Sequence, residues 1–290
     1  MKKSILFVIN PISGGKNKNN FRVLADQYLD KNVFEAKYVF TEQNGHAHQI
    51  ALDAIENNTD IVVAVGGDGT VNEIASALEG SGKIMGIIPY GSGNGLARSL
   101  GIPLKTKQAI SRLNELKTDN IDCGVINNYK FFSTAGVGFD AHISSCFAQN
   151  KTRGFRGYVK TIFAEIGKYK AQNYQIEIDG SVYKRRAFMV SIANSSQFGN
   201  NAHIAPFASV KDGLLDVCII KPFPLYLSPV MIYHMFNKST HKSKYVEIIQ
   251  GKKIRIIREK EDMIHLDGEP LLLDPVLEVM IKPLSLTIIK

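Results

Sequence analysis

The chain has 290 residues, of which 44% are hydrophobic and 21% are charged, as expected for a globular protein with one large domain or two modest ones. No stretch approaches the roughly 18 apolar residues that span a bilayer, and residues 5–9 are too short for a signal-peptide core. Three widely separated cysteines form no disulfide framework, so we expect a cytoplasmic protein.

The net charge of +8 is unevenly distributed. Residues 1–122 contain 13 Lys and Arg against 13 Asp and Glu, whereas residues 123–290 contain 22 against 14. This asymmetry indicates a polyanionic partner of the second part, either a nucleic acid or an anionic membrane surface. A basic face that is only solvated is the alternative.

Apolar strand patterns alternate with helical spacing over the first 116 residues. Strands are predicted at 4–9, 35–40, 61–65 and 84–88, and helices at 21–29, 45–57, 71–78 and 106–116. The alternation predicts a doubly wound α/β domain with ligand loops at the carboxyl ends of the strands.

The central stretch is 61–73, IVVAVGGDGTVNE. Its glycines let a phosphate approach the backbone closely, and the helix N-terminus that follows adds about half a positive charge. Asp68 would repel bare phosphate, so it suggests a divalent cation or a ribose hydroxyl nearby. The alternative is a tight strand–helix turn without a ligand.

From residue 121 onward strand follows strand, which predicts an antiparallel sandwich-like domain. The predicted strand segments are 122–127, 130–141, 174–180, 183–196, 213–220 and 252–259.

Two helical segments of this second part are amphipathic or apolar. Residues 151–170 have an apolar stripe surrounded by Lys and Arg, which could lie at a bilayer interface, although packing on the sandwich is the expectation. Residues 225–236 precede the basic tract 238–244 and could also touch lipid, but we expect them to be buried.

GGDGT followed by VNE resembles the nucleotide loop of the diacylglycerol kinase, sphingosine kinase and bacterial lipid kinase superfamily. NAD kinases carry a similar GGDGT. The NPISG at residues 10–14 and the PYGSGNGLA at 89–97 are similar to further lipid kinase motifs, in family order, and GFDA at 138–141 belongs with them. Many bacterial relatives have Thr in place of Ser92 and Asp in place of Gly95.

The resemblance implies ATP and Mg²⁺ as cofactors. It places the nucleotide at Asn10, Thr41, Gly66, Gly67, Asp68, Gly69, Thr70, Val71, Asn72, Gly91, Ser92 and Asn94. A Walker lysine is missing, because GGK at 14–16 does not fit that motif. Charge neutralisation is therefore expected from Mg²⁺, backbone dipoles and Lys16.

Residues 205–216 match a family segment that holds a structural Mg²⁺ in bacterial members. Carried over, its ligands are the Asp212 carboxylate and the carbonyls of Ser209 and Leu214. The alternative is an Asp-Gly turn without metal.

The resemblance assigns catalysis to Asp267 and Glu269, as a base and its partner in an open order, together with Asp68. Without the family match, this DGE would be a plain turn.

We therefore predict a cytoplasmic, peripherally membrane-associated lipid kinase that transfers the γ-phosphoryl group of Mg-ATP to a diacylglycerol-like lipid. The expected fold is an α/β domain at 1–122, to which 284–290 return, and a β-rich lipid-binding domain at 123–283, with the active site in a cleft between them. The expected partners are an anionic membrane and a second copy of the chain, and no nucleic acid. An NAD kinase and a catalytically silent lipid-binding homologue are the alternatives.

Overall fold

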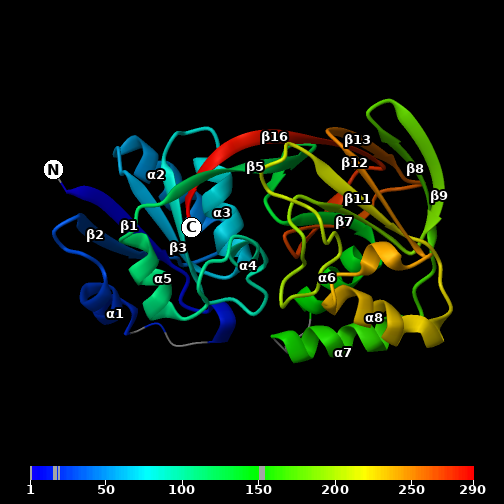
Figure 1. Cartoon of the computed structure of the whole chain (residues 1–290), viewed down its shortest axis with the longest axis horizontal. Helices are drawn as coiled ribbons and strands as arrows, with labels where there is room; N and C mark the ends of the chain where they lie inside the picture. Colours follow the sequence, from blue (N-terminus) through cyan, green and yellow to red (C-terminus); the bar gives the residue numbers. More distant parts are fainter. Residues whose placement is uncertain (1, 16–17, 19, 150–153) are drawn as a thin grey trace. The chain divides into compact units, whose positions relative to one another are not determined.

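A computed structural model describes residues 2–15, 18, 20–149 and 154–290 (Figure 1). The chain divides into two compact units, each with its own core. The first unit comprises residues 1–121 and 284–290, and the second comprises residues 122–283.

The first unit is built on a parallel sheet with the order β2-β1-β3-β4-β16. Its strands are β1 (Lys3–Ile9), β2 (Phe34–Phe40), β3 (Ile61–Gly66), β4 (Ile84–Pro89) and the last residues of β16 (Val276–Ile289). Every residue of β3 is buried, as its β-branched apolar sequence predicts for a central parallel strand.

Helices cover both faces of this sheet. They are α1 (Phe21–Tyr28), α2 (His46–Glu56), α3 (Asp68–Leu78), the short α4 (Gly95–Ser99) and α5 (Thr106–Leu113). The chain moves from β1 to β2 on one side, and then back past β1 to β3 and β4. Right-handed crossovers therefore place α1 on the face opposite α2 and α3, and α5 packs beside α1 (Figure 1).

The second unit is a sandwich of two sheets, so the predicted combination of an α/β part and an antiparallel β-rich part is confirmed. One sheet contains β8 (Gln172–Ile178), β9 (Ser181–Ala187), β13 (Lys253–Ile257) and the first residues of β16, and β5 (Thr118–Ile126) pairs with β6 (Tyr129–Phe131) and β16. The other has the order β12 (Val246–Gly251), β11 (Leu215–Ile220), β10 (Met189–Ala193), β7 (Thr134–Gly138), β14 (Asp262–Leu266) and β15 (Glu269–Leu273).

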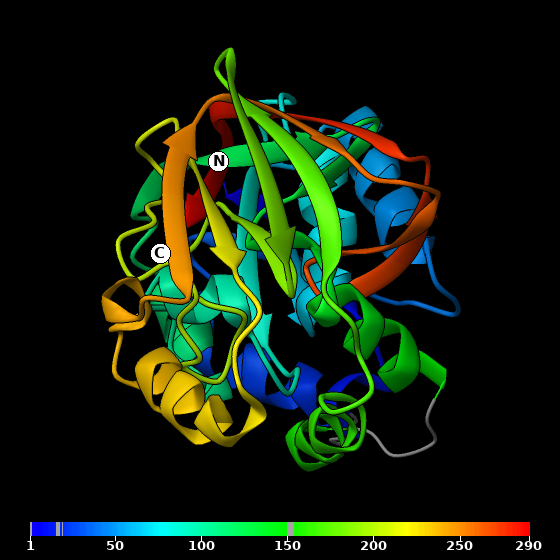
Figure 2. The ribbon, with the colours of Figure 1, turned by 90° about the vertical axis from the view of Figure 1, so that its right-hand side faces the viewer.

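Three helices of the second unit lie together at one end of its strands (Figure 2). They are α6 (Phe139–Gln149), α7 (Phe155–Glu165) and α8 (Ser228–Phe236), with 3-10 turns at Leu225–Leu227 and Thr240–Lys242. All three helices contribute to one apolar cluster with β10 and β11.

Several predicted boundaries were wrong. Residues 130–141 are not one strand, because β7 ends at Gly138 with a φ of 92° and α6 begins at Phe139. Helix α3 begins inside the glycine loop at Asp68, and α5 ends at Leu113. The last strand, β16, is longer than the segment expected to return to the first unit, because it starts at Val276.

Burial was predicted correctly for one helix and wrongly for the other. In α7, Tyr158 and Ile162 pack on the shared cluster, whereas the Phe163 side chain is 63% exposed. Residues 151–153 of the predicted helix lie outside the described residues. In α8 only Ser228 and Met231 are buried, so the expected burial of 225–236 is wrong. No helix in the described ranges has both the length and the apolar character needed to cross a membrane.

An ion-pair network links the two sheets of the sandwich. Arg185 on β9 donates to both carboxylate oxygens of Glu247 on β12, at 3.0 and 2.9 Å, and Lys221 Nζ lies 3.2 Å from the same carboxylate. The hydrogen bond from Arg185 lowers the pKa of Glu247 from its ordinary 4.5 to about 2. The network therefore stabilises the fold whenever Glu247 is ionised.

Replacing this carboxylate should lower stability in a pH-dependent way. Glu247→Gln should reduce the free energy of unfolding by about 1 kcal/mol near neutral pH, because it removes a partly exposed bidentate pair. A carboxylate with a depressed folded-state pKa stabilises above its unfolded pKa, so the difference from wild type should shrink as the pH falls from 4.5 towards 2. Urea unfolding at neutral and acidic pH measures this. Glu259→Gln, at an exposed site, is the control, and a difference independent of pH would contradict the assignment.

Candidate active site

Three loops of the first unit lie at one edge of its sheet. They follow β1, β3 and β4 and contain residues 10–15, 66–70 and 90–95. These strands are parallel neighbours, so their carboxyl ends meet at the same edge. The strand order reverses at β1 and β3, and open α/β sheets bind ligands at such a reversal.

The loops contact one another through their backbones. A Cβ on Gly91 would lie 2.6 Å from the Cα of Gly67, and a Cβ on Gly14 would overlap the carbonyl oxygen of Tyr90. Gly14 also has a φ of 63°, which favours glycine. The Tyr90 N–H donates to the Gly66 carbonyl at 2.7 Å. Side chains larger than glycine would push these loops apart.

Asp68 joins the second loop to the third. Its carboxylate accepts the backbone N–H groups of Asn94 and Gly95, both at 2.8 Å. Asn94 has a φ of 52° and donates from its side chain to the Gly91 carbonyl at 2.7 Å. The partners shown for Asp68 are thus backbone N–H groups, where the sequence suggested a cation or a ribose hydroxyl.

Asn10 bridges the reversal point between β1 and β3. Its Nδ2 donates to Thr70 Oγ1 at 3.0 Å, and its Oδ1 accepts the Ile12 N–H at 3.1 Å. At the end of β2, Thr41 donates its N–H to the Ile9 carbonyl at 2.9 Å.

The structure brings the predicted nucleotide residues to this edge with different exposure. Thr41, Gly66, Thr70, Val71 and Asn94 are buried; Asn10, Gly67, Asp68, Gly69, Asn72 and Gly91 are half-buried; Ser92 is exposed. Helix α3 starts after Gly67, which has no side chain to cap it, so its N-terminus can offer backbone N–H groups to an anion.

In the second unit, the predicted catalytic carboxylates occupy a hairpin. Asp267 and Gly268 form the two-residue turn between β14 and β15, with φ values of 48° and 92°, as in a type I′ turn. The Asp267 carboxylate accepts the N–H groups of Phe132, Ser133 and Thr134 at 2.9, 2.8 and 3.0 Å. Glu269, at the start of β15, is exposed.

The predicted metal turn has oxygen donors and extra acidic neighbours. Asp212 and Ser209 are exposed, and Asp212 Oδ1 accepts the Leu214 N–H at 3.0 Å. Although Asp212 is exposed, partial desolvation of its carboxylate raises its pKa, and the charge of Asp122 adds to this shift. Burial raises the pKa of Asp216 to about 6, and the charge of Asp212 adds to it. A bound cation stabilises the ionised form of desolvated, neighbouring carboxylates, and the turn offers oxygen donors, so these residues fit Mg²⁺.

Comparison with known families agrees with both units. The model of the diacylglycerol kinase catalytic domain matches residues 4–126, and that of the YegS C-terminal NAD kinase beta sandwich-like domain matches residues 133–290. The chain belongs to the diacylglycerol kinase family.

Relatives of this lipid kinase extend over most of its length. A protein named diacylglycerol kinase from Staphylococcus epidermidis is 28% identical and covers 93% of this chain and 86% of its own. A "Probable lipid kinase YegS-like" from Chromohalobacter salexigens is 28% identical and covers 79% of this chain and 76% of its own. The crystal structure of a diacylglycerol kinase from Bacillus anthracis has the same fold, with a TM-score of 0.75 at 20% identity over 99% of this chain and 96% of that one.

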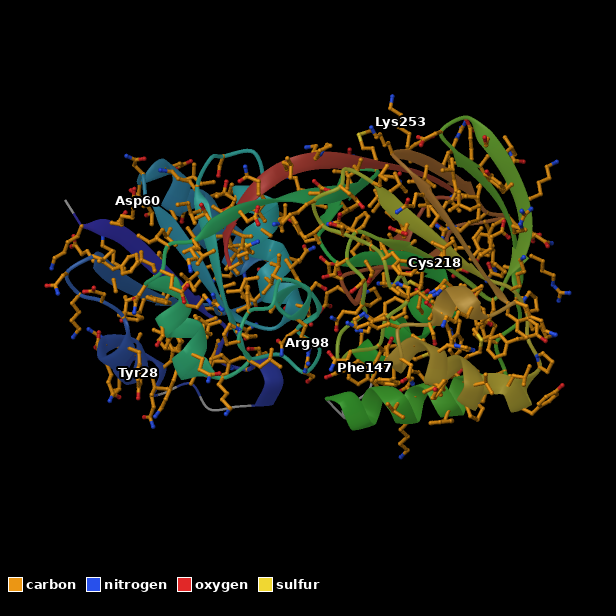
Figure 3. The ribbon with its side chains drawn as sticks, in the orientation of Figure 1. Tyr28, Asp60, Arg98, Phe147, Cys218 and Lys253 are labelled. Atoms are coloured by element: carbon orange, nitrogen blue, oxygen red, sulfur yellow. The ribbon has the colours of Figure 1, made fainter. Side chains whose placement is uncertain are left out.

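Sequence reasoning missed residues that hold the loops and the start of α2 at this edge of the sheet. Glu73 accepts the N–H groups of Gly45 and Ala47, both at 3.0 Å, at the start of α2. The buried Lys18 donates to the Ser13 carbonyl at 2.7 Å, while Lys16 lies outside the described residues. Arg98 on α4 donates from Nε to the Gly93 carbonyl at 2.9 Å (Figure 3). Among these residues, only Glu73 could have been singled out from the sequence, because it belongs to the VNE motif.

Sequence reasoning also missed two supports of the hairpin. The buried Arg258 donates to four carbonyl oxygens at the base of β14 and β15, those of Asp262, Met263, Leu273 and Asp274, at 2.8 to 3.3 Å. His265 Nε2 lies 3.0 Å from Asp140 Oδ2, and both side chains are buried. Asp140 belongs to the GFDA motif, so the motif provided a signal for this pair. No motif in the sequence indicated a role for Arg258.

Removing the Asp68 carboxylate should loosen the third loop. Asp68→Ala deprives the Asn94 and Gly95 N–H groups of their acceptor, a loss comparable to that of a helix cap, about 1 to 2 kcal/mol. We expect roughly tenfold weaker binding of a non-hydrolysable ATP analogue, measured by calorimetry. Asp53→Ala, on the exposed face of α2, is the control. Unchanged affinity in Asp68→Ala would contradict this role.

Proposed function

We propose that this kinase transfers the γ-phosphoryl group of ATP, bound with Mg²⁺, to the hydroxyl group of a diacylglycerol-like membrane lipid. The observation that carries the proposal is the set of glycine loops packed backbone to backbone at the strand-order reversal, in a chain of the diacylglycerol kinase family. Relatives named diacylglycerol kinase support the choice of acceptor.

The first unit binds the triphosphate through its backbone. The N–H groups at the start of α3 and the dipole of that helix favour phosphate oxygens, and the glycines leave room for close approach. Asn10 and Thr70, which hydrogen-bond to each other, offer an amide and a hydroxyl to the nucleotide. The exposed Ser92 contributes another hydroxyl at the third loop.

Mg²⁺ would be held in the second unit by the Asp212 carboxylate and the Ser209 and Leu214 carbonyls. Bound there, it would supply positive charge among Asp122, Asp212 and Asp216. Asp122 is buried and accepts the Gly213 N–H at 2.8 Å, so it holds the turn from the interior of the second unit. We assign this Mg²⁺ a structural role, which is to hold the turn in place.

The two carboxylates of the hairpin have different surroundings, and this divides their roles. Asp267 receives three backbone N–H groups, so we assign it to positioning residues 132–134 and the turn. Glu269 is exposed and can meet a lipid hydroxyl. Glu269 accepts the hydroxyl proton as the lipid oxygen attacks the γ-phosphorus, and the bond to the β-phosphate oxygen breaks to release ADP.

Replacing the assigned base should slow chemistry without weakening nucleotide binding. Glu269→Gln should lower kcat by about a hundredfold or more, because the amide cannot accept the proton. Asp267→Asn should lower both kcat and the melting temperature, because an amide in its place satisfies fewer of the three N–H donors. Transfer from labelled ATP to diacylglycerol in mixed micelles measures kcat.

Glu261→Gln, an exposed glutamate just before β14, is the matched control. The same assay with NAD as acceptor tests the rival that the C-terminal sandwich allows. Near-normal turnover in Glu269→Gln would show that Glu269 is not the base. Phosphorylation of NAD in place of lipid would overturn the proposed lipid kinase function.

A membrane substrate requires a surface that docks on the bilayer, and we assign that surface to α8 and the turn before it. Five apolar or aromatic side chains there are 46% to 79% exposed: Leu225, Tyr226, Val230, Tyr233 and Phe236. We call them the α8 face. The exposed Lys238, Lys242 and Lys244 follow in sequence, and residues 222–245 include no Asp or Glu.

This composition fits an anionic bilayer better than a protein partner. Aromatic side chains bury readily at the level of the lipid headgroups, and each lysine near an anionic surface adds about 1 kcal/mol. Phe207, 71% exposed with its ring centroid 4.8 Å from that of His241, extends the apolar surface.

Polar substitutions on the α8 face should release the kinase from vesicles. The double variant Tyr226→Ser/Tyr233→Ser should lose at least about tenfold in affinity for phosphatidylglycerol-containing vesicles, because two interfacial aromatics are removed. Co-sedimentation measures this, with Val182→Ser, an exposed apolar residue on β9, as the control. Salt should weaken wild-type binding. An equal loss of vesicle affinity in Val182→Ser would contradict the assignment. So would vesicle binding that neither the double substitution nor salt weakens.

A further inference from the structure

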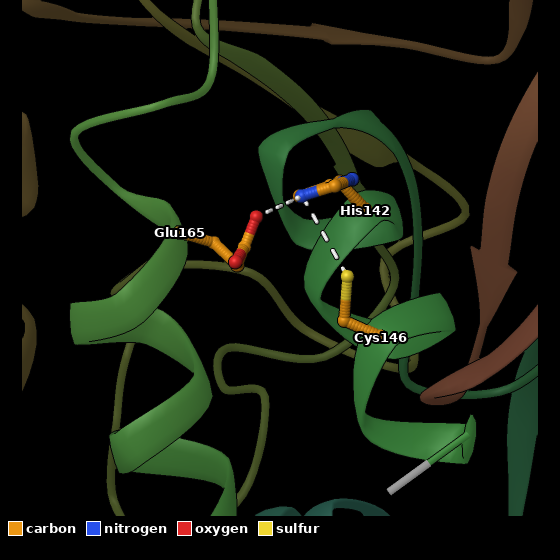
Figure 4. A group of neighbouring side chains, drawn as sticks. All are labelled: His142, Cys146 and Glu165. Atoms are coloured by element: carbon orange, nitrogen blue, oxygen red, sulfur yellow. Dashed lines mark hydrogen bonds and ion pairs between the residues drawn. The ribbon is translucent and has the colours of Figure 1, made fainter.

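Three metal-ligating side chains meet between α6 and α7, outside the candidate active site (Figure 4). His142 and Cys146 are four residues apart on α6, so they lie on the same face of the helix. Glu165 is the last residue of α7. No other group of this kind was found among the residues that the structure describes.

The donor atoms have the spacing of a tetrahedral metal site. His142 Nε2 lies 3.0 Å from Glu165 Oε2 and 3.6 Å from Cys146 Sγ, and all three donor atoms are within 4.8 Å of one another. Ligands around a tetrahedral Zn²⁺ are separated by about 3.3 to 3.7 Å, given Zn–N, Zn–O and Zn–S bonds of about 2.0 to 2.3 Å. The three side chains would need only small movements to enclose an ion.

The surroundings hold the ligands in place and leave access. The ring of Tyr169 lies 5.4 Å from that of His142, and Lys168 Nζ binds the other oxygen of Glu165 at 2.8 Å. Oε2 of Glu165 therefore faces the histidine. The side chains of His142 and Glu165 are 37% and 22% exposed, so an ion and a fourth ligand from solvent can reach the site.

A plain ion pair between His142 and Glu165 would explain two of the residues but not the third. The thiol of Cys146 points at the same nitrogen that contacts the carboxylate (Figure 4). Imidazole, thiolate and carboxylate together favour Zn²⁺ and related transition metals, whereas Mg²⁺ prefers oxygen ligands alone.

We propose that His142, Cys146 and Glu165 form a binding site for a transition-metal cation of the Zn²⁺ class, with water as the fourth ligand. The site differs in chemistry from the oxygen-only Mg²⁺ turn. It joins α6 to the end of α7, and α6 carries Asp140, which contacts His265 on β14. Binding deprotonates the thiol and releases its proton to solvent.

Titration of tag-free, metal-free protein with Co²⁺ tests the site without ATP or lipid. We expect one equivalent of Co²⁺ to give the intense visible absorption of a tetrahedral centre and a thiolate-to-cobalt charge-transfer band, both lost when Zn²⁺ is added. Millimolar Mg²⁺ should not displace the ion. Zn²⁺ should also raise the melting temperature, because it binds only the folded arrangement of the two helices.

Cys146→Ser should abolish the charge-transfer band, and Glu165→Gln should weaken Co²⁺ binding by about tenfold or more. His48→Ala, a histidine on α2 away from the cluster, should bind like wild type. Melting of each variant without metal shows whether it is folded. An absent charge-transfer band in wild type, or a band retained in folded Cys146→Ser, would overturn the proposal. Either result leaves the lipid kinase function intact.

Discussion

The close approach of loop backbones at the edge of the parallel sheet is the constraint on which the candidate active site of the first unit depends. Gly14, Gly67 and Gly91 let three successive loops pack without intervening side chains. In the proposed function, backbone N–H groups of these loops bind phosphate without a Walker lysine. The buried Lys18, held by loop carbonyls and the Tyr90 ring, supports the loops from within.

Carboxylates of the family motifs bind backbone N–H groups of segments distant in sequence. Asp68 receives two such groups, Asp267 receives three, and Glu73 receives those of Gly45, Ala47 and His48. Asp122, which lies outside these motifs, receives the N–H group of Gly213. Charge-assisted hydrogen bonds of this kind are stronger than neutral ones and fix loops that have few apolar contacts. Asp68 and Asp267, which the family resemblance presents as catalytic, thus also hold backbone segments together. The exposed Glu269 differs from them in its surroundings.

The sequence predicts much of the fold because the periods of its elements are clear. The apolar run of β3 and the alternation before residue 116 indicate the α/β part, and the repeated strands indicate the sandwich. Burial of helices is harder to predict, because α7 and α8 both have aromatic residues and basic neighbours. In α7, Tyr158 and Ile162 face the core, whereas in α8 Tyr233 and Phe236 face outward. That choice depends on neighbours supplied by distant strands.

The hydrogen-bond partners of polar side chains could not be predicted from the sequence either. The acceptor role of Asp68 toward Asn94 depends on how two loops from different strands meet. The pairing of His142 with Glu165 depends on the packing of α6 against α7. Motifs indicate which residues matter, whereas the contacts that define their roles arise only from the folded chain.

Strand β16 has a consequence for how the protein is made. Its first residues pair with β13 in the second unit, and Thr287 and Ile288 pair with β4 in the first. The ribosome therefore completes all of residues 122–283 before the first unit can receive its fifth parallel strand. Until then, the edge of β4 lacks its partner and stays open to pairing with other nascent chains. The parallel sheet of the first unit is therefore completed only after the second unit has been synthesised.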